Sequence, residues 1–109
     1  MSDYILVFIT TASSQEAEQL AKTLVEKRLA ACGNIVPEMR SVFWWKDTIE
    51  TGPEALLILK SRAELFPTLV NVVKTHHSYE VPEIIAIPIL SGSEDYLKWI
   101  AEETQKSQI

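Results

Sequence analysis

Two kinds of hydrophobic pattern follow one another along the chain, and together they predict the order of its elements. Continuous apolar runs rich in β-branched and aromatic residues are typical of strands. Such runs occur at residues 4–9, 55–59 and 84–90, and the strands predicted from the whole pattern cover residues 4–9, 34–45, 48–61 and 83–90. Apolar residues three and four positions apart predict helices that start after Ser13, near Pro67 and after Ser93. The predicted order is β-α-β-β-α-β-α. Its first six elements are typical of a ferredoxin-like βαββαβ sandwich, here followed by an extra C-terminal helix.

The ends of the predicted helices carry local signals. Ser13 and Glu16 have the spacing of a capping box, and Ser61 and Glu64 have the same spacing before the second helix. Glycine is favoured just beyond a helix C-terminus, so we expect Gly33 to end the first helix.

A long hairpin is predicted between the second and third strands. Its turn lies either at Lys46-Asp47, a short polar break, or at Gly52-Pro53, which is the stronger turn signal on its own. We prefer Lys46-Asp47 and interpret Gly52-Pro53 as a bulge in a long hairpin arm.

Two prolines indicate which strands lie at the edges of the sheet. A ferredoxin-like sheet has the strand order 4-1-3-2, so its second and fourth strands are edges. Pro37 and Pro88 fall in these two strands, and proline is confined to edges and bulges because it removes a ladder donor. The sequence therefore predicts an α+β fold with one four-stranded antiparallel sheet.

Several predicted strands are apolar on both faces, although one face of such a sheet often meets solvent. The adjacent Trp44 and Trp45 must also point to opposite sides of a regular strand. Three helices of this size cannot cover both faces, and the bare face would exceed the apolar patches usual on monomers. We expect a second copy of the chain to cover it, with both tryptophans in the interface. The alternative is that the third helix and the hairpin arm fold over it.

Composition narrows the class of protein. The 109 residues, 47% of them hydrophobic, are expected to form one globular domain over residues 1–109 that frays after Gln105. A net charge of -5 argues against a nucleic-acid partner, and no apolar run approaches the roughly 18 residues of a membrane span. The N-terminus is acidic and enters a strand directly, and a single cysteine allows no intrachain disulfide. We therefore expect a cytoplasmic protein.

Residues 74–83 contain both histidines of the chain and form the first candidate site. In helical projection His77 falls within the apolar stripe of the second helix, so we interpret it as a helix-end histidine that closes the core. His76 falls at the edge of that stripe and is the better candidate ligand. Adjacent side chains diverge on helices and strands alike, so a shared metal ion would need a turn here or ligands from another subunit.

Other residues give weaker chemical signals. Cys32 is interpreted as a small buried hydrophobic residue. A further set of polar residues either lines a pocket or forms surface pairs of little energetic value. They are Glu50, Lys60, Tyr79 and Glu83. Because the sequence offers no glycine-rich phosphate loop and no nucleophile–base pair, we expect no enzymatic activity.

Five segments resemble a known protein family over nearly the whole chain. They are residues 29–35 (LAACGNI), 41–46 (SVFWWK), 60–62 (KSR), 76–84 (HHSYEVPEI) and 93–99 (SEDYLKW). In this order and spacing they resemble the divalent-cation tolerance protein CutA family. The histidine-to-proline segment and the Trp-Lys hairpin are the most specific parts of the resemblance.

The resemblance implies a ferredoxin-like subunit in a homotrimer, and it favours the hairpin turn at Lys46-Asp47. It also implies a role in metal tolerance with divalent cations as ligands, Cu²⁺ foremost and Zn²⁺ as the alternative. The ligands suggested for the family fall here on His76, His77, Glu83 and Cys32.

Two further functions remain open from the sequence. One is a regulatory trimer, similar to nitrogen-regulatory signalling proteins, that binds a small anionic metabolite in clefts between subunits. Glu50, Lys60 and Tyr79 would line such a cleft. The other is a structural or anchoring trimer whose tryptophan-bearing hairpin docks a partner.

Overall fold

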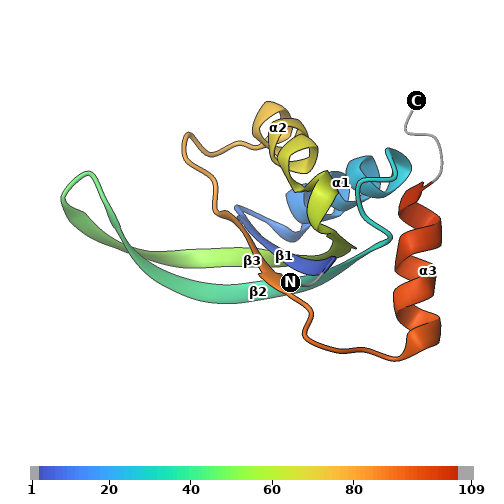
Figure 1. Ribbon diagram of the computed structural model, residues 1–109. Coiled ribbons are helices and arrows are strands. Elements are labelled where there is room, and N and C mark those ends of the chain that lie inside the picture. Colours follow the sequence, from blue (N-terminus) through green and yellow to red (C-terminus); the bar gives the residue numbers. More distant parts are fainter. Residues whose placement is uncertain (1–2, 106–109) are drawn as a thin grey trace.

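The computed structural model describes residues 3–105 and places two helices on one side of a sheet, from which a long two-stranded arm extends (Figure 1). The elements are β1 (Tyr4–Thr11), α1 (Ser14–Glu26), β2 (Cys32–Trp45), β3 (Thr48–Arg62), the 3₁₀ turn η1 (Ala63–Leu65), α2 (Phe66–His76), β4 (Ile84–Pro88) and α3 (Glu94–Gln105). The predicted order of strands and helices is confirmed. The fraying predicted after Gln105 lies outside the described residues.

The four strands form one antiparallel sheet in the order β2-β3-β1-β4, which confirms the predicted ferredoxin-like arrangement. Both edge strands contain a proline, as expected. Pro88 ends β4, and Pro37 lies in a register shift of β2 between Val36 and Met39. Each proline therefore sits where a missing N–H does least harm to the ladder.

The hairpin turns at Lys46 and Asp47, as preferred from the sequence. Both residues have positive φ, 49° and 66°, which suits the tight two-residue turn that matches the strand twist. The bulge predicted at Gly52-Pro53 is wrong, because Gly52 pairs in register with Ser41. The irregularity lies on the opposite strand near Pro37, which cannot donate to the ladder.

The core lies between one face of the sheet and the helices α1 and α2. Alternate residues of the central strands point into it and are fully buried, including Val7 of β1 and Leu59 of β3. Leu24 of α1 and Leu69 and Val73 of α2 are fully buried against them. This packing fixes the C-terminal end of α2, where the candidate histidines lie.

Two predicted helix signals have other roles. The helix α1 ends at Glu26 rather than near Gly33, and Arg28 takes the left-handed conformation (φ 61°) instead of a glycine. Gly33 lies within β2, where an added Cβ would come within 3.1 Å of the Ala21 Cβ. Ser61 does not cap a helix, because its hydroxyl donates to the Leu29 carbonyl oxygen at 2.6 Å.

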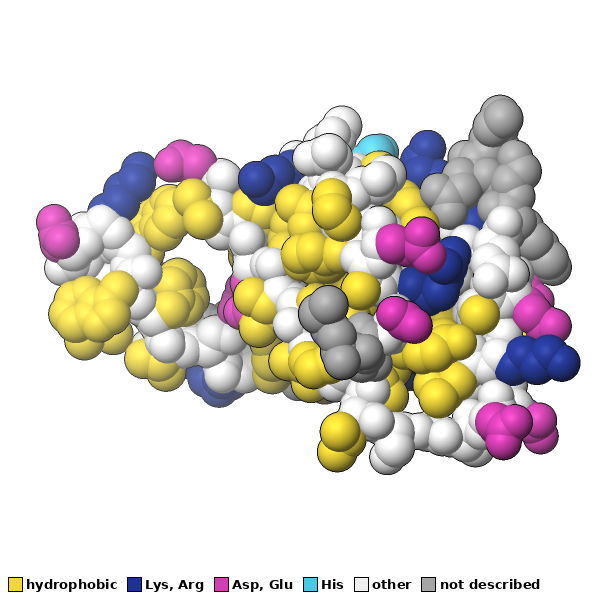
Figure 2. Space-filling model, in the orientation of Figure 1, with side chains coloured by type: hydrophobic (Ala, Val, Ile, Leu, Met, Phe, Trp, Pro, Cys, Tyr) yellow, Lys and Arg dark blue, Asp and Glu magenta, His cyan; other side chains and the backbone are white. Residues whose placement is uncertain are grey.

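The sheet face that points away from α1 and α2 is apolar and incompletely covered. We call it the open sheet face, and its apolar members are Leu6, Phe8, Val36, Leu56, Ile58, Ile85 and Ile87. The hairpin arm also exposes hydrophobic side chains, and Trp44 retains 71% of its accessible surface (Figure 2). The prediction of strands with two apolar faces is thus confirmed.

The helix α3 stands at the end of the sheet opposite the arm (Figure 1). Arg62 at the end of β3 holds its last turn, donating to the Thr104 hydroxyl at 2.7 Å and to the Thr104 carbonyl oxygen at 2.9 Å. Neither α3 nor the arm folds over the open sheet face as a whole. Among the described residues, no helix has the length and apolar character needed to cross a membrane.

Candidate functional site

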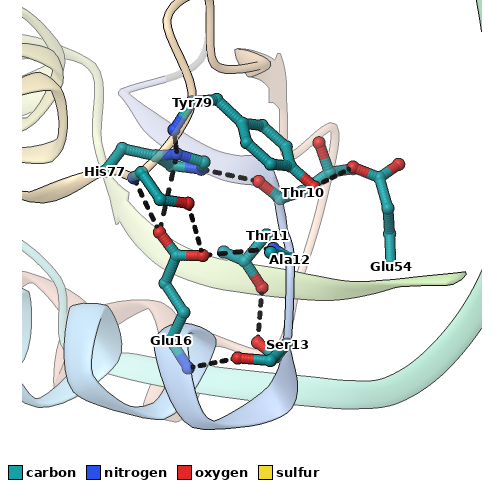
Figure 3. A network of polar contacts seen from close by, with 9 residues as sticks. Thr10, Thr11, Ala12, Ser13, Glu16, Glu54, His77 and Tyr79 are labelled. Carbon is teal, nitrogen blue, oxygen red and sulfur yellow. Dashed lines mark hydrogen bonds and ion pairs between the residues drawn. The ribbon is translucent and has the colours of Figure 1, made fainter.

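His77 ends α2 and connects it to β1. Its side chain is fully buried, with Nε2 2.7 Å from the Thr10 carbonyl oxygen and Nδ1 3.0 Å from the Tyr79 backbone nitrogen (Figure 3). A carbonyl oxygen can only accept and an amide N–H can only donate. His77 is therefore the neutral tautomer that carries its proton on Nε2.

This arrangement leaves neither ring nitrogen of His77 available to a metal ion. Ligation through Nε2 would break the bond to Thr10, and ligation through Nδ1 would displace the Tyr79 N–H. The expectation that His77 closes the core at the end of α2 is confirmed, and its side chain contacts the backbone of β1. The metal-ligand role implied by the family resemblance does not fit this residue.

Glu16, in the first turn of α1, ties the loop after His77 to that helix. Its carboxylate accepts from the Ser78 N–H at 2.9 Å, the Ser78 hydroxyl at 3.0 Å and the Ala12 N–H at 3.1 Å (Figure 3). Burial alone would raise the pKa of Glu16, but these hydrogen bonds outweigh it and hold the pKa below the usual value. The predicted cap is also present, since the Glu16 N–H donates to the Ser13 hydroxyl.

Tyr79 extends the same network to β3. Its hydroxyl donates to Glu54 at 2.7 Å, and its ring lies 4.8 Å from the ring of His77. Burial raises the pKa of Tyr79, and the Glu54 carboxylate that accepts its hydrogen bond raises the pKa further. Residues 77–79 are therefore fixed to β1, α1 and β3 at once.

His76 is the histidine that can serve as a ligand. It is exposed, and its Nδ1 lies 2.9 Å from the Val72 carbonyl oxygen. Because this oxygen can only accept a hydrogen bond, Nδ1 carries the proton and donates it. The remaining nitrogen, Nε2, carries a lone pair. The His76 side chain lines a surface groove of about 320 Å³ between α1 and α2. Glu16, Gln19, Leu20, Lys22 and Thr23 line this groove with His76.

The other two predicted metal ligands lie elsewhere. Cys32 opens β2 on the open sheet face and is half-buried, not fully buried as interpreted from the sequence. Glu83 is exposed just before β4. Within residues 3–105, no cluster of three or more histidine, cysteine, aspartate or glutamate side chains could hold a metal ion. One chain therefore does not bring the four predicted ligands together.

The predicted pocket residues also lie apart within one chain. Glu50 is on the hairpin arm opposite Phe43, whereas Lys60 lies ten positions further along β3, about 33 Å away in an extended strand. Tyr79 is engaged with Glu54. Trp44 and Trp45, predicted at a subunit interface, both lie exposed near the tip of the arm.

Sequence reasoning missed the partners that matter most here. Glu16 was interpreted only as a helix cap, and Glu54, Thr10 and Asn34 were not singled out. Glu16 lies 62 positions before its partner Ser78. A single sequence carries no signal for such a distant pairing. The only hint in the sequence was that Glu16 is a polar residue at the start of a helix that follows a buried strand.

Known proteins are similar to this chain over most of its length. The chain matches the family described as CutA1 divalent ion tolerance protein over residues 5–103. The divalent-cation tolerance protein CutA of Thermus thermophilus is 46% identical over 99 residues, which cover 91% of this chain and 96% of that protein. The chloroplastic protein CutA 1 of Oryza sativa is 42% identical over 103 residues, covering 94% of this chain and 58% of that protein. The chain thus spans little more than half of the rice relative.

Solved structures share the fold. The crystal structure of CutA1 from Oryza sativa matches with a TM-score of 0.92 at 40% identity, and the match covers 97% of each chain. The periplasmic divalent cation tolerance protein CutA from Archaeoglobus fulgidus matches with a TM-score of 0.90 at 44% identity, covering 93% of this chain and 98% of that chain. One relative is thus named chloroplastic and one periplasmic. The cytoplasmic location predicted from the sequence is therefore wrong.

Proposed function

Because this chain belongs to the family of CutA1 divalent ion tolerance proteins, we propose that it binds divalent cations through His76 and acts in metal tolerance as a homotrimer. We propose Cu²⁺ as the preferred ion and Zn²⁺ as the next. Neutral imidazole suits both ions, and Cu²⁺ leads the affinity series of divalent first-row metals at such sites.

The observation that carries this proposal is the geometry of His76. The hydrogen bond from Nδ1 to the Val72 carbonyl oxygen fixes the tautomer and the ring, so the lone pair of Nε2 is presented outside the helix. Metal-binding histidines commonly use their second nitrogen in this way. Buried His77 keeps both nitrogens engaged, so a single imidazole from this segment is available per chain.

A site with one imidazole is incomplete by itself. Water, the carboxylate of Glu16 in the same groove, or groups of another subunit would supply the remaining positions. Such a site binds its ion weakly and exchanges it readily. This is consistent with a protein that buffers or senses an excess of an ion and does not hold one as a structural cofactor.

The open sheet face and the hairpin arm support the assembly. Ile85 and Ile87 of the open sheet face retain 52% and 45% of their surfaces, and an isolated two-stranded arm is marginally stable in water. Further copies of the chain would bury both features in one interface. These exposed apolar features support self-association, and the number three rests on the family resemblance.

Calorimetric titration with Cu²⁺ tests the site. We expect His76→Ala to weaken binding by about tenfold or more, since loss of groups that merely support a ligand already weakens metal binding about 10–100-fold. Lys74→Ala is the matched control, because it removes an exposed side chain from the same helical turn. Equal affinity in wild type and His76→Ala would refute the proposed site. The same titration with Zn²⁺ tests the order of preference.

A further inference from the structure

Lys60 places a positive charge on the open sheet face. In β1 and β2 its cross-strand neighbours are Leu6 and Cys32. Its ammonium group donates to the side-chain carbonyl oxygen of Asn34. Within the described part of the chain no carboxylate forms an ion pair with Lys60. A charge on an apolar face is costly once the face is covered, unless a counter-ion is present.

Asn34 has its orientation fixed by this contact. The Lys60 ammonium can only donate, so the carbonyl oxygen of Asn34 must face it. The Cys32 sulfur lies 3.9 Å from the same oxygen. The two N–H groups of the Asn34 amide are thus left for another acceptor. Asn34 and Lys60 lie on the same face of the sheet, on the neighbouring strands β2 and β3.

Tyr96 brings a third donor to this place from α3. Its hydroxyl is in hydrogen-bonding contact with the Cys32 thiol, and its ring lies 5.5 Å from that of Trp99. Burial, followed by the neighbouring Cys32, raises the pKa of Tyr96 above its usual value. Three side chains from β2, β3 and α3 therefore gather around Cys32.

We propose that Lys60, Asn34 and Tyr96 form a binding site for a small oxyanion, a carboxylate or a phosphate. The set carries one positive charge, several N–H and O–H donors and no acid. That is the complement of an oxyanion. The apolar neighbours Leu6 and Ile58 lower the local dielectric and so strengthen each of these contacts.

This site is independent of the proposed cation site. His76 lies in the groove between α1 and α2, whereas Lys60 lies on the opposite face of the sheet. It also differs from the pocket predicted from the sequence, which joined Lys60 to Tyr79 and Glu50. An oxyanion bound here would place a ligand on the face that we expect a second copy to cover. Ligand and assembly would then be coupled.

The test is calorimetric titration of the full chain with inorganic phosphate and, separately, with acetate and citrate, in chloride buffer of constant ionic strength. We expect at least one of these oxyanions to bind. We expect Lys60→Gln to weaken that binding by about tenfold or more, because hydrogen bonds to charged groups are the strong ones. Lys74→Gln is the matched control, since Lys74 is exposed on α2, which packs on the other face of the sheet. The phosphate and carboxylate titrations distinguish the two ligand types.

A second variant separates binding from folding. Asn34→Asp is nearly isosteric and gives Lys60 a built-in carboxylate, so the folded protein should keep its stability while oxyanion binding is lost. The inference is overturned if no oxyanion binds the wild type, or if Lys60→Gln and Asn34→Asp both bind as the wild type does. It is also overturned if Lys60→Gln weakens self-association while no oxyanion binds, because a second copy would then supply the carboxylate. None of these outcomes depends on Cu²⁺ binding.

Discussion

The imidazole of His77 is joined to the carbonyl oxygen of Thr10 by a 2.7 Å hydrogen bond between residues 67 positions apart in the sequence. The bond links the last turn of α2 to the end of the central strand β1. Together with the Tyr79 N–H on Nδ1, it occupies both polar atoms of a fully buried ring. His77 is therefore part of the scaffold that positions its exposed neighbour His76.

His77→Ala should lower the free energy of unfolding by about 2–4 kcal/mol, because it leaves a cavity and two unpaired backbone groups. His76→Ala should change it by less than about 0.5 kcal/mol, since His76 is exposed. Urea unfolding at one fixed protein concentration measures both values. Similar losses for the two variants would contradict the division of roles between the histidines.

Glu16 should make the stability of the protein depend on acid. Its pKa in the folded state lies below the ordinary value of a glutamate, so its contribution is present above that ordinary value and is lost as the pH falls through the lowered folded-state pKa. Glu16→Gln should lower the free energy of unfolding by about 1–2 kcal/mol near neutral pH. The difference from wild type should shrink in acid.

Glu18→Gln is the control for this experiment. Glu18 lies on the exposed side of α1 in an ion pair with Lys22, and its side chain is 59% exposed, so its loss should matter little at any pH. Unfolding by urea at several pH values compares the three proteins. A pH profile of Glu16→Gln parallel to that of wild type would show that the Ser78 contacts do not stabilise the carboxylate.

The open sheet face should be the assembly surface. Ile85→Glu places a charge where the isolated chain is half-exposed, so the subunit should still fold while the assembly dissociates. Light scattering after size-exclusion chromatography should give about three times the chain mass of 12.3 kDa for wild type and a lower mass for the variant. Thr68→Glu adds the same charge to the exposed side of α2 and should leave the mass unchanged. An unaltered mass for Ile85→Glu would place the interface elsewhere.

Sequence patterns were sufficient for the architecture because the determinants of the architecture are local. Strand-length apolar runs, helical spacing and the Lys46-Asp47 break each act within a few residues, and the edge prolines then order the strands. The bulge was placed on the wrong strand for a local reason too. Gly52-Pro53 is a strong turn signal by itself, but the ladder breaks at Pro37 on the partner strand.

The candidate sites were less predictable because they are made of distant pairs. Lys60 contacts Asn34 across a hairpin, and Glu16 of α1 contacts Ser78 in the loop after α2. Neither contact can be recognised from the spacing of residues in the sequence. The metal-ligand set implied by the family resemblance included Cys32, which lies on the other face of the sheet from His76.

The two strand glycines Gly33 and Gly52 offer a matched test of the packing that holds α1 on the sheet. Both lie in the hairpin strands with negative φ, so alanine meets no backbone strain at either position. At Gly52 an added Cβ meets nothing within 4 Å, whereas at Gly33 it would lie 3.1 Å from the Ala21 Cβ and from a Leu59 methyl group.

Gly52→Ala should therefore stabilise the protein by about 0.4–1 kcal/mol, through the lower entropy of the unfolded chain. Gly33→Ala should destabilise it by about 1–3 kcal/mol, because α1 must move away from the sheet. Thermal unfolding of both variants at equal concentration gives the comparison. Ala21→Gly combined with Gly33→Ala should recover part of the loss, since it removes one of the two colliding atoms. If Gly33→Ala is as stable as Gly52→Ala, the helix has room to shift, and glycine at position 33 is not required by packing.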